Sequence, residues 1–232
     1  MRGLGTAVNV ATVLAGTGIG LLVGPRLPPR LRITVLQGVG LVTVVLGILN
    51  ATRTRNLVFP LAAIVVGGAV GEGLRIEDGL EGLGSWLRHR LGVEEGVEGR
   101  RFVDGFVSAS LLFCIGPLTI LGSLSDGLGR GAEQLLVKAA LDGSVALVLA
   151  STLGIGVGLS ALSVLVVQGG ITATAGLLAG VLDERMVDEL TATGGIIVLG
   201  IALRLLDLKA VRVASFLPAL LLAPVLVALF AR

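Results

Sequence analysis

Long apolar runs separated by short charged segments make up most of the chain. Eight of these runs have about the length at which a helix crosses the roughly 30 Å hydrocarbon layer of a membrane. They are Leu4–Gly24, Ile33–Ala51, Leu57–Leu74, Phe102–Leu124, Leu135–Leu153, Gly158–Leu182, Leu190–Leu206 and Ala214–Phe230. The first run is too long for the apolar core of a typical signal peptide, and seven more follow it. The pattern predicts an all-α polytopic membrane protein with about eight transmembrane helices, all of them retained.

One connection, Arg75–Arg101, is longer and more polar than the others. Its apolar residues recur at helical spacing among charges: Ile76, Leu80, Leu83, Leu87 and Leu91, with Trp86 beside them. The spacing favours an amphipathic helix lying in the membrane interface, with a solvated surface helix as the alternative. The segment is too small to hold a core of its own, so we expect a single transmembrane domain over residues 1–232.

The two ends of the chain resemble each other in order. Gly20–Gly24 recurs as Gly176–Gly180, and Phe59-Pro60 recurs around Phe216–Pro218. Gly38–Gly40 followed by Leu46–Ile48 recurs as Gly194-Gly195 followed by Leu199–Ile201, and the offset stays between 153 and 158 residues throughout. This offset pairs runs five crossings apart, which traverse the membrane in opposite directions. The similarity predicts an inverted-topology repeat, as in many secondary transporters, with repeat one at about 4–74, a central pair at 102–153 and repeat two at about 158–230.

Glycine recurs at every fourth position in several runs. Gly16, Gly20 and Gly24 share this spacing, and so do Gly67 and Gly71. A small residue on each turn gives a helix a flat face for close approach to another helix. Packing within the chain is the favoured interpretation, and a subunit interface is the alternative; we also expect a homodimer.

Composition agrees with a membrane location and excludes several functions. Hydrophobic residues make up 54% of the chain and charged residues 15%, and the mean hydropathy is +0.98. In soluble domains about a quarter of the residues are charged. A net charge of +2 is too small to suggest a nucleic-acid partner. One cysteine, Cys114, and one histidine, His89, cannot build a disulfide, a zinc site or a catalytic triad. We expect no enzyme activity and no cofactor, except Na⁺ as a candidate ion.

Basic residues predict the orientation, because cytoplasmic loops are enriched in lysine and arginine. With eight crossings, one side carries Arg26, Arg30, Arg32, Arg75, Arg88, Arg90, Arg100, Arg101, Arg204, Lys209 and Arg212. The other side carries Arg2, Arg53, Arg55, Arg130, Lys138, Arg185 and Arg232. The excess favours an orientation in which both termini lie outside. The membrane is expected to be the plasma membrane.

Polar residues inside the apolar runs are the candidates for function, because they are costly in hydrocarbon. Lys138 and Asp142 lie four residues apart on one helical face and can pair with each other. Asp142 is then either a neutralised partner of Lys138, or a cation ligand or proton carrier with Lys138 as the internal competitor. The amides of Asn9, Gln37 and Gln168 are candidate interhelical hydrogen bonds or substrate contacts. Asp104 and Asp126 flank the fourth run and are expected to be solvated.

Three predicted interruptions lie in the central runs. Pro117 should break its helix, because it removes the hydrogen bond to the carbonyl of Phe113. Ser151–Gly154 and Gln168–Gly170 suggest similar loosening. Carbonyls of broken helices coordinate Na⁺ in inverted-repeat transporters. We therefore predict a Na⁺ site formed by Asp142, Ser110, Thr119, Ser151 and Thr152, with Gln168, Thr172, Lys138, Asn9 and Gln37 around it.

Several of these segments also resemble a known family. They are Gly5-Thr6 with Asn9, Ser108–Pro117, Ile120–Ser123, Asp126-Gly127, Lys138–Gly143, Ala150–Gly156, Gln168-Gly169 with Ile171-Thr172, and Phe216–Leu220. Together they are similar to the bacterial domain-of-unknown-function 554 family, over nearly the whole chain, although Val167 stands where a tyrosine is usual. The resemblance implies a bacterial multi-spanning membrane protein with a possible link to transport, and it implies no mechanism.

Two classes of function remain after these exclusions. The first is a small secondary transporter, with Na⁺ as candidate coupling ion and an unknown small ion or metabolite as substrate, or an ion channel. The second is a non-transporting scaffold whose polar residues only hold helices together. Interrupted helices favour the first class, because a scaffold does not need them.

Overall fold

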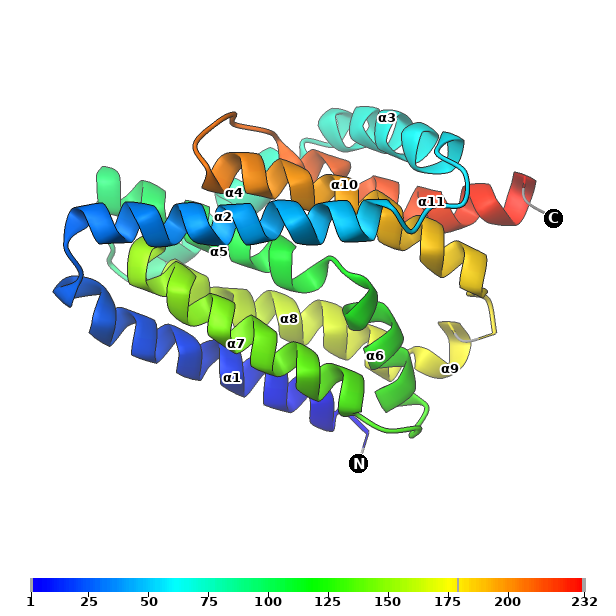
Figure 1. Cartoon of the computed structure of the whole chain (residues 1–232), viewed down its shortest axis with the longest axis horizontal. Helices are drawn as coiled ribbons and strands as arrows, with labels where there is room; N and C mark the ends of the chain where they lie inside the picture. Colours follow the sequence, from blue (N-terminus) through cyan, green and yellow to red (C-terminus); the bar gives the residue numbers. More distant parts are fainter. Residues whose placement is uncertain (1, 179, 231–232) are drawn as a thin grey trace. The chain divides into compact units, whose positions relative to one another are not determined.

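The computed structural model describes residues 2–178 and 180–230, and their regular structure is helical throughout (Figure 1). The helices are α1 (Leu4–Val23), α2 (Pro29–Ala51), α3 (Val58–Gly73), α4 (Ile76–Arg90), α5 (Val97–Cys114), α6 (Pro117–Gly127), α7 (Glu133–Leu153), α8 (Gly156–Ala173), α9 (Ala175–Leu178), α10 (Glu184–Leu205) and α11 (Leu217–Phe230). Two short 3₁₀ turns, η1 (Gly24–Arg26) and η2 (Val213–Phe216), extend α1 and precede α11.

The lengths of these helices fit a membrane-spanning protein. In the described residues six helices are long and apolar enough to cross a bilayer, and the number rises to eight if each of two bent pairs forms one span. The bent pairs are α3 with α4, at 56°, and α5 with α6, at 60°. The predicted all-α membrane fold is confirmed, and the predicted number of eight requires both bent pairs. Helix α4 follows the amphipathic pattern, whereas residues 97–101 of that connection already belong to α5.

The residues group into two compact units, and neither coincides with one of the predicted repeats. Unit 1 comprises Met1–Val39, Glu81–Cys114 and Leu118–Ala179, whereas unit 2 comprises Gly40–Leu80, Ile115–Pro117 and Gly180–Arg232. Unit 1 therefore contains α1, α5, α7 and α8 with nearly all of α6, and unit 2 contains α3, α10 and α11. Each unit draws helices from both halves of the chain.

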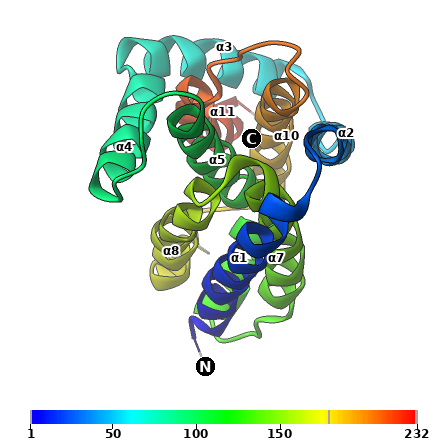
Figure 2. The ribbon, with the colours of Figure 1, turned by 90° about the vertical axis from the view of Figure 1, so that its left-hand side faces the viewer.

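In unit 1, α1 lies against α7 and runs parallel to it, as Figures 1 and 2 show. The glycines of α1 make this contact: a Cβ added at Gly16 would lie 2.1 Å from the backbone oxygen of Gly143, and one at Gly20 would lie 2.3 Å from that of Leu147. A methyl group does not fit at these distances. The four-residue glycine spacing of α1 therefore serves packing within the chain.

Helix α8 contacts both α1 and α5 within unit 1. It runs antiparallel to α1, since Thr172 lies beside Thr6 and Gly158 lies beside Thr17. It runs parallel to α5, where a Cβ on Gly156 would meet the backbone oxygen of Phe102. One polar contact, 2.8 Å between the hydroxyls of Ser110 and Ser163, joins α5 and α8 further along.

Unit 2 is built on close contacts between α3 and α11. A Cβ added at Gly67 would lie 2.5 Å from the backbone nitrogen of Ala219, and one at Gly71 would lie 1.9 Å from the backbone oxygen of Ser215. Ala63, Ala219 and Ala223 form a fully buried core at this contact. Small residues again set the distance between two helices.

Two buried carboxylates hold the interhelical loops of unit 2. Glu189 accepts hydrogen bonds from the backbone N–H of Arg55, at 2.8 Å, and from the hydroxyl of Thr54, at 2.6 Å. Glu77 accepts one from the backbone N–H of Ala214, at 2.6 Å, and pairs with Arg204 at 2.8 Å. Both glutamates are 3% exposed, so each buried carboxylate is satisfied by donors of an interhelical loop.

Candidate functional site

The break between α5 and α6 leaves one backbone carbonyl without its helical partner. Helix α5 ends at Cys114 and α6 begins at Pro117, which has no N–H to offer the carbonyl of Phe113. That oxygen instead accepts hydrogen bonds from Lys138 Nζ, at 2.7 Å, and Thr119 Oγ1, at 3.3 Å. The predicted interruption at Gly116-Pro117 is confirmed, and the side chain at the freed carbonyl is a lysine.

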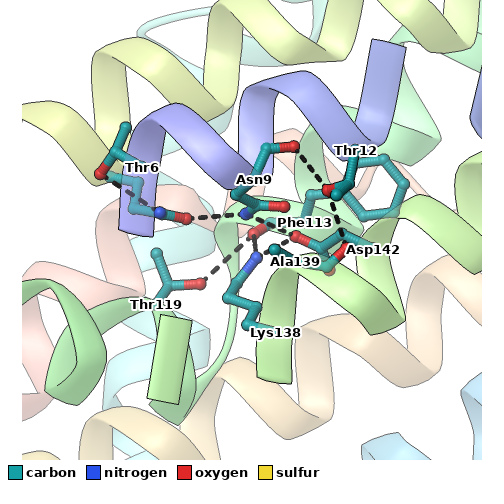
Figure 3. Close-up of polar contacts among 9 residues, drawn as sticks. Thr6, Asn9, Thr12, Phe113, Thr119, Lys138, Ala139 and Asp142 are labelled. Carbon is teal, nitrogen blue, oxygen red and sulfur yellow. Dashed lines mark hydrogen bonds and ion pairs between the residues drawn. The ribbon is translucent and has the colours of Figure 1, made fainter. Parts of the chain in front are cut away.

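Lys138 also forms an ion pair with Oδ2 of Asp142, one turn further along α7 (Figure 3). The two side chains are only 6% and 12% exposed. A buried charge is costly unless it is paired and hydrogen-bonded. The ammonium therefore satisfies the carboxylate and the freed carbonyl at once.

Two amides connect this ion pair to the neighbouring helices. The Nδ2 group of Asn9, on α1, donates to Asp142 Oδ2 and to Gln168 Oε1, both at 2.9 Å. Gln168, on α8, in turn donates through Nε2 to Thr6 Oγ1 at 3.2 Å. Asn9 is fully buried, and its Oδ1 atom has no hydrogen-bond partner among the described residues. One acceptor at the site is thus available to a further donor or cation.

Two threonines add hydrogen bonds near the site, one from α1 to α7 and one within α8. Thr12 donates to the carbonyl of Ala139 on α7 at 2.8 Å, and Thr172 donates to the carbonyl of Gln168 in its own helix at 2.9 Å. Thr12 is not among the residues predicted from the sequence, and Thr6 is named there only for the family resemblance. Their spacing is a signal for both, because residues three apart on either side of Asn9 share one helical face.

Other residues of the predicted sodium site form no hydrogen bond with Asp142 in the described part of the chain. Ser151 and Thr152 donate to carbonyls of their own helix, at Val148 and Leu149. Ser151 comes nine residues after Asp142 on α7, about 13.5 Å further along the helix. Ser110 bonds to Ser163, and Gln37 is exposed on α2. The residues that do assemble are Asn9, Thr119, Lys138, Asp142, Gln168 and Thr172.

Of the three predicted interruptions, the one at Gln168–Gly170 is wrong. Helix α8 is continuous from Gly156 to Ala173 and therefore includes Gln168–Gly170. Glycine keeps its N–H and costs a helix only about 1 kcal/mol, so two glycines do not break it as proline does. Ser151–Gly154 is instead the end of α7, where Gly154 adopts a φ of 84° and stops the helix.

The expectation that Asp126 is solvated is also wrong. Asp126, near the end of α6, is 2% exposed. Its carboxylate accepts a hydrogen bond from the backbone N–H of Gly5 at 3.1 Å. This N–H belongs to the first turn of α1, where helical donors have no partner within the helix and a negative charge is favourable. Asp126 therefore secures the start of α1, whereas Asp104 is exposed as expected.

The site can be described by its charges. The carboxylate of Asp142 accepts from the ammonium of Lys138 and from the amide of Asn9. These two donors also bond to neutral oxygens, the carbonyl of Phe113 and the amide oxygen of Gln168. In the described residues, no three His, Cys, Asp or Glu side chains come together in an arrangement that could hold a metal ion. A single negative charge with carbonyl, amide and hydroxyl oxygens matches a monovalent cation better than a transition metal.

Comparison with known proteins adds the family. A family model described as "Protein of unknown function (DUF554)" matches residues 4–228. The chain belongs to this family. It is 29% identical to "Uncharacterized protein YqgA" of Escherichia coli (strain K12) over 224 residues, which cover 95% of this chain and 94% of that protein. It is 30% identical to "Uncharacterized membrane protein YdfK" of Bacillus subtilis (strain 168) over 227 residues, 96% of this chain and 95% of that protein.

No solved structure matches this chain significantly. Membership in DUF554 agrees with the resemblance found in the sequence and with a membrane location. The family description assigns no chemistry, so a function for this DUF554 protein has to be argued from the site.

Proposed function

We propose that this protein is a small secondary transporter that exchanges a monovalent cation, with Na⁺ as the candidate, at the Lys138–Asp142 pair. The observation that carries the proposal is the position of Lys138 Nζ between Asp142 Oδ2 and the carbonyl of Phe113. The ammonium of Lys138 already occupies a cation-binding position formed by a carboxylate and the carbonyl at a helix break. Carbonyls of this kind coordinate Na⁺ in inverted-repeat transporters.

The oxygen atoms around this position could coordinate a cation in place of the ammonium. If Lys138 withdraws, Asp142 and the Phe113 carbonyl each lose a donor, and Thr119 lies 3.3 Å from that carbonyl. Asn9 Oδ1, buried and without a partner, is a further oxygen on α1. A cation entering here replaces one positive charge by another, so the carboxylate is never left buried and unpaired.

The arrangement of helices in unit 1 supports the inverted repeat on which alternating access would rest. The offset of the sequence repeat pairs α1 with α8 and leaves α5 and α7 as the central pair. Helix α1 runs parallel to α7 while α8 runs parallel to α5, and α1 and α8 run in opposite directions. An inverted repeat that exchanges α1 with α8 and α7 with α5 predicts these same relations.

Unit 2 supports the same symmetry through its loops. Arg55 pairs with Asp188 at 2.8 Å, beside Glu189, which holds the backbone of that loop. Arg212 pairs with Asp78 at 2.5 Å, beside Glu77, which holds the backbone of the second loop. The two arginines are 157 residues apart, within the offset of the sequence repeat. Arginines at equivalent positions of the two loops thus each pair with an acidic residue, whereas these acidic residues, on α10 and α4, are not themselves related by the offset.

A non-transporting scaffold is the second candidate function. It is favoured by the ion pair itself, because Lys138 neutralises Asp142 and the amides of Asn9 and Gln168 join three helices. In a scaffold the pair stays closed and no cation enters. The two functions therefore differ in whether the folded protein binds Na⁺ selectively.

Thermal unfolding of the purified protein in NaCl, KCl and choline chloride tests this difference. At Na⁺ concentrations a hundredfold above the dissociation constant, binding stabilises the fold by about 2.7 kcal/mol, or of order 5–10 °C. We expect this gain in the parent and its loss in Asp142→Asn. Ser151→Ala is the matched control, because Ser151 lies at the far end of α7 and bonds only to its own helix.

Uptake of radioactive sodium into proteoliposomes loaded with unlabelled NaCl then distinguishes transport from binding. We expect exchange with the parent and none with Asp142→Asn. A parent without Na⁺ preference in the unfolding assay contradicts the sodium site. Selective stabilisation without exchange keeps the site but contradicts the transporter.

The assembly and orientation are proposed with the function. We propose a homodimer in the bacterial plasma membrane with both termini outside. Because the glycine faces of α1 and α3 are occupied within the chain, the dimer has to use another surface. Crosslinking in mild detergent checks the dimer, and monomer alone speaks against it.

Reporter fusions at both ends check the orientation, and opposite locations for the two termini exclude eight spans.

A further inference from the structure

A cavity of about 290 Å³ lies in unit 1 at the end opposite the ion pair. It is formed where α1 and α7 end and where α2, α5 and α8 begin. Its lining includes Arg32, Glu98, Arg101, Ser151, Gly154 and Ile155. These ends belong to the side of the membrane to which the basic residues assign the cytoplasm.

Two guanidinium groups line this cavity without a carboxylate partner. Among the described residues, neither Arg32 nor Arg101 forms an ion pair. Arg32 donates through Nη2 to the carbonyl of Gly24 at 2.5 Å, which fixes the guanidinium beside the end of α1. Its Nε is buried and has no acceptor in the described part of the chain. Because buried N–H groups are normally hydrogen-bonded, this one points to an acceptor supplied by a ligand.

The start of α8 adds further donors at the cavity wall. Gly154 turns the chain with a φ of 84°, so that α8 begins at Gly156 directly after the lining residue Ile155. The backbone N–H groups of Ile155 and Gly156 have no hydrogen-bond partner in the described structure. Unpaired N–H groups at a helix start carry partial positive charge and bind anions.

We propose that this cavity binds a phosphate group, either in the headgroup of an anionic phospholipid or free in solution. Phosphate offers several acceptor oxygens to the two guanidinium groups and to the N–H groups of α8. Glu98 leaves the lining with one net positive charge, which suits one phosphodiester. Basic pockets between transmembrane helices on the cytoplasmic side bind anionic headgroups. The inference is independent of the cation site.

Native mass spectrometry of the full-length protein tests the proposal. The probes are short-chain phosphatidylglycerol, phosphatidylcholine with the same chains, and inorganic phosphate. We expect the parent to retain phosphatidylglycerol in preference to phosphatidylcholine. Arg32→Gln and Arg101→Gln should each weaken this binding about tenfold, since each removes charge-assisted hydrogen bonds.

Arg30→Gln is the matched control, because Arg30 is exposed on the same helix as Arg32 and does not line the cavity. It should bind phosphatidylglycerol as the parent does. Unfolding temperatures measured without lipid verify that all variants are folded. If Arg32→Gln does not fold, Arg101→Gln alone tests the proposal. Equal retention of both lipids, or equal loss in Arg30→Gln, overturns the proposal. Retention of inorganic phosphate without lipid, lost in the same two variants, confirms the cavity and assigns it to soluble phosphate.

Discussion

Removing the charge of Lys138 is the sharpest perturbation of the site. In Lys138→Met the carboxylate of Asp142 keeps its hydrogen bond from Asn9 but loses the one ion-pair partner that it has among the described residues. Both side chains of the pair are buried, and removal of one partner of a buried pair costs about 3–5 kcal/mol. For a chain of this length we expect the unfolding temperature to fall by of order 10 °C.

The second arm of this experiment is a double-mutant cycle. Lys138→Met with Asp142→Asn removes both charges, and the asparagine can still accept from Asn9. The double variant should therefore lose less stability than the two single variants together, with a coupling energy of about 2 kcal/mol. Lys209→Met is the matched control, because Lys209 is the second lysine of the chain and is exposed. It should shift the free energy of unfolding by less than about 0.5 kcal/mol.

Unfolding of all four variants in detergent, measured with NaCl and with choline chloride, completes the test. If the ammonium occupies a cation-binding position, Na⁺ should stabilise Lys138→Met more than the parent, because the ammonium no longer competes with Na⁺. It should not stabilise the double variant. A Lys138→Met variant as stable as Lys209→Met, or additive losses in the cycle, would refute the reasoning from the buried pair.

Two further predictions concern packing and the loops. Gly16→Ala places a methyl group 2.1 Å from the oxygen of Gly143 and should cost about 1–3 kcal/mol in thermal unfolding, whereas Gly18→Ala, which meets open space, should be neutral or slightly stabilising. A neutral Gly16→Ala would mean that α1 does not lie this close to α7. Glu189→Gln should cost about 1–3 kcal/mol by weakening its bonds to Thr54 and Arg55. Glu184→Gln, whose side chain is 87% exposed, is the control and should be silent; equal effects of the two would contradict the role of Glu189.

Features that depend on one helix could be predicted from the sequence. The Lys138–Asp142 pair follows from a spacing of four residues, and the free carbonyl of Phe113 follows from the missing N–H of Pro117. The apolar runs gave the helices to within a few residues for most elements. In each case the physical cause lies within one or two turns of the chain, where helical geometry fixes the neighbours.

Features that depend on which helices meet could not be predicted in this way. The bond from Asn9 to Gln168 joins residues 159 positions apart, and nothing in the local pattern of α1 or α8 indicates the partner. Asp126 was misjudged for the same reason, since its partner is the backbone of Gly5 at the start of a distant helix. Gln168–Gly170 was misjudged locally, because glycine was treated like proline although it keeps its N–H.

The lysine changes what the predicted cation site requires. A site formed only by oxygen ligands would gain one positive charge on binding Na⁺. Here every cation that enters must displace the ammonium of Lys138, which is part of α7. The net charge of the buried cluster stays at zero only if Lys138 leaves as the cation arrives. Its ammonium bonds to the carbonyl of Phe113, which lies just before the bend between α5 and α6. Binding of a cation at this position is therefore coupled to the contact between α7 and the broken helix formed by α5 and α6. A transport cycle has to include a rearrangement of this contact.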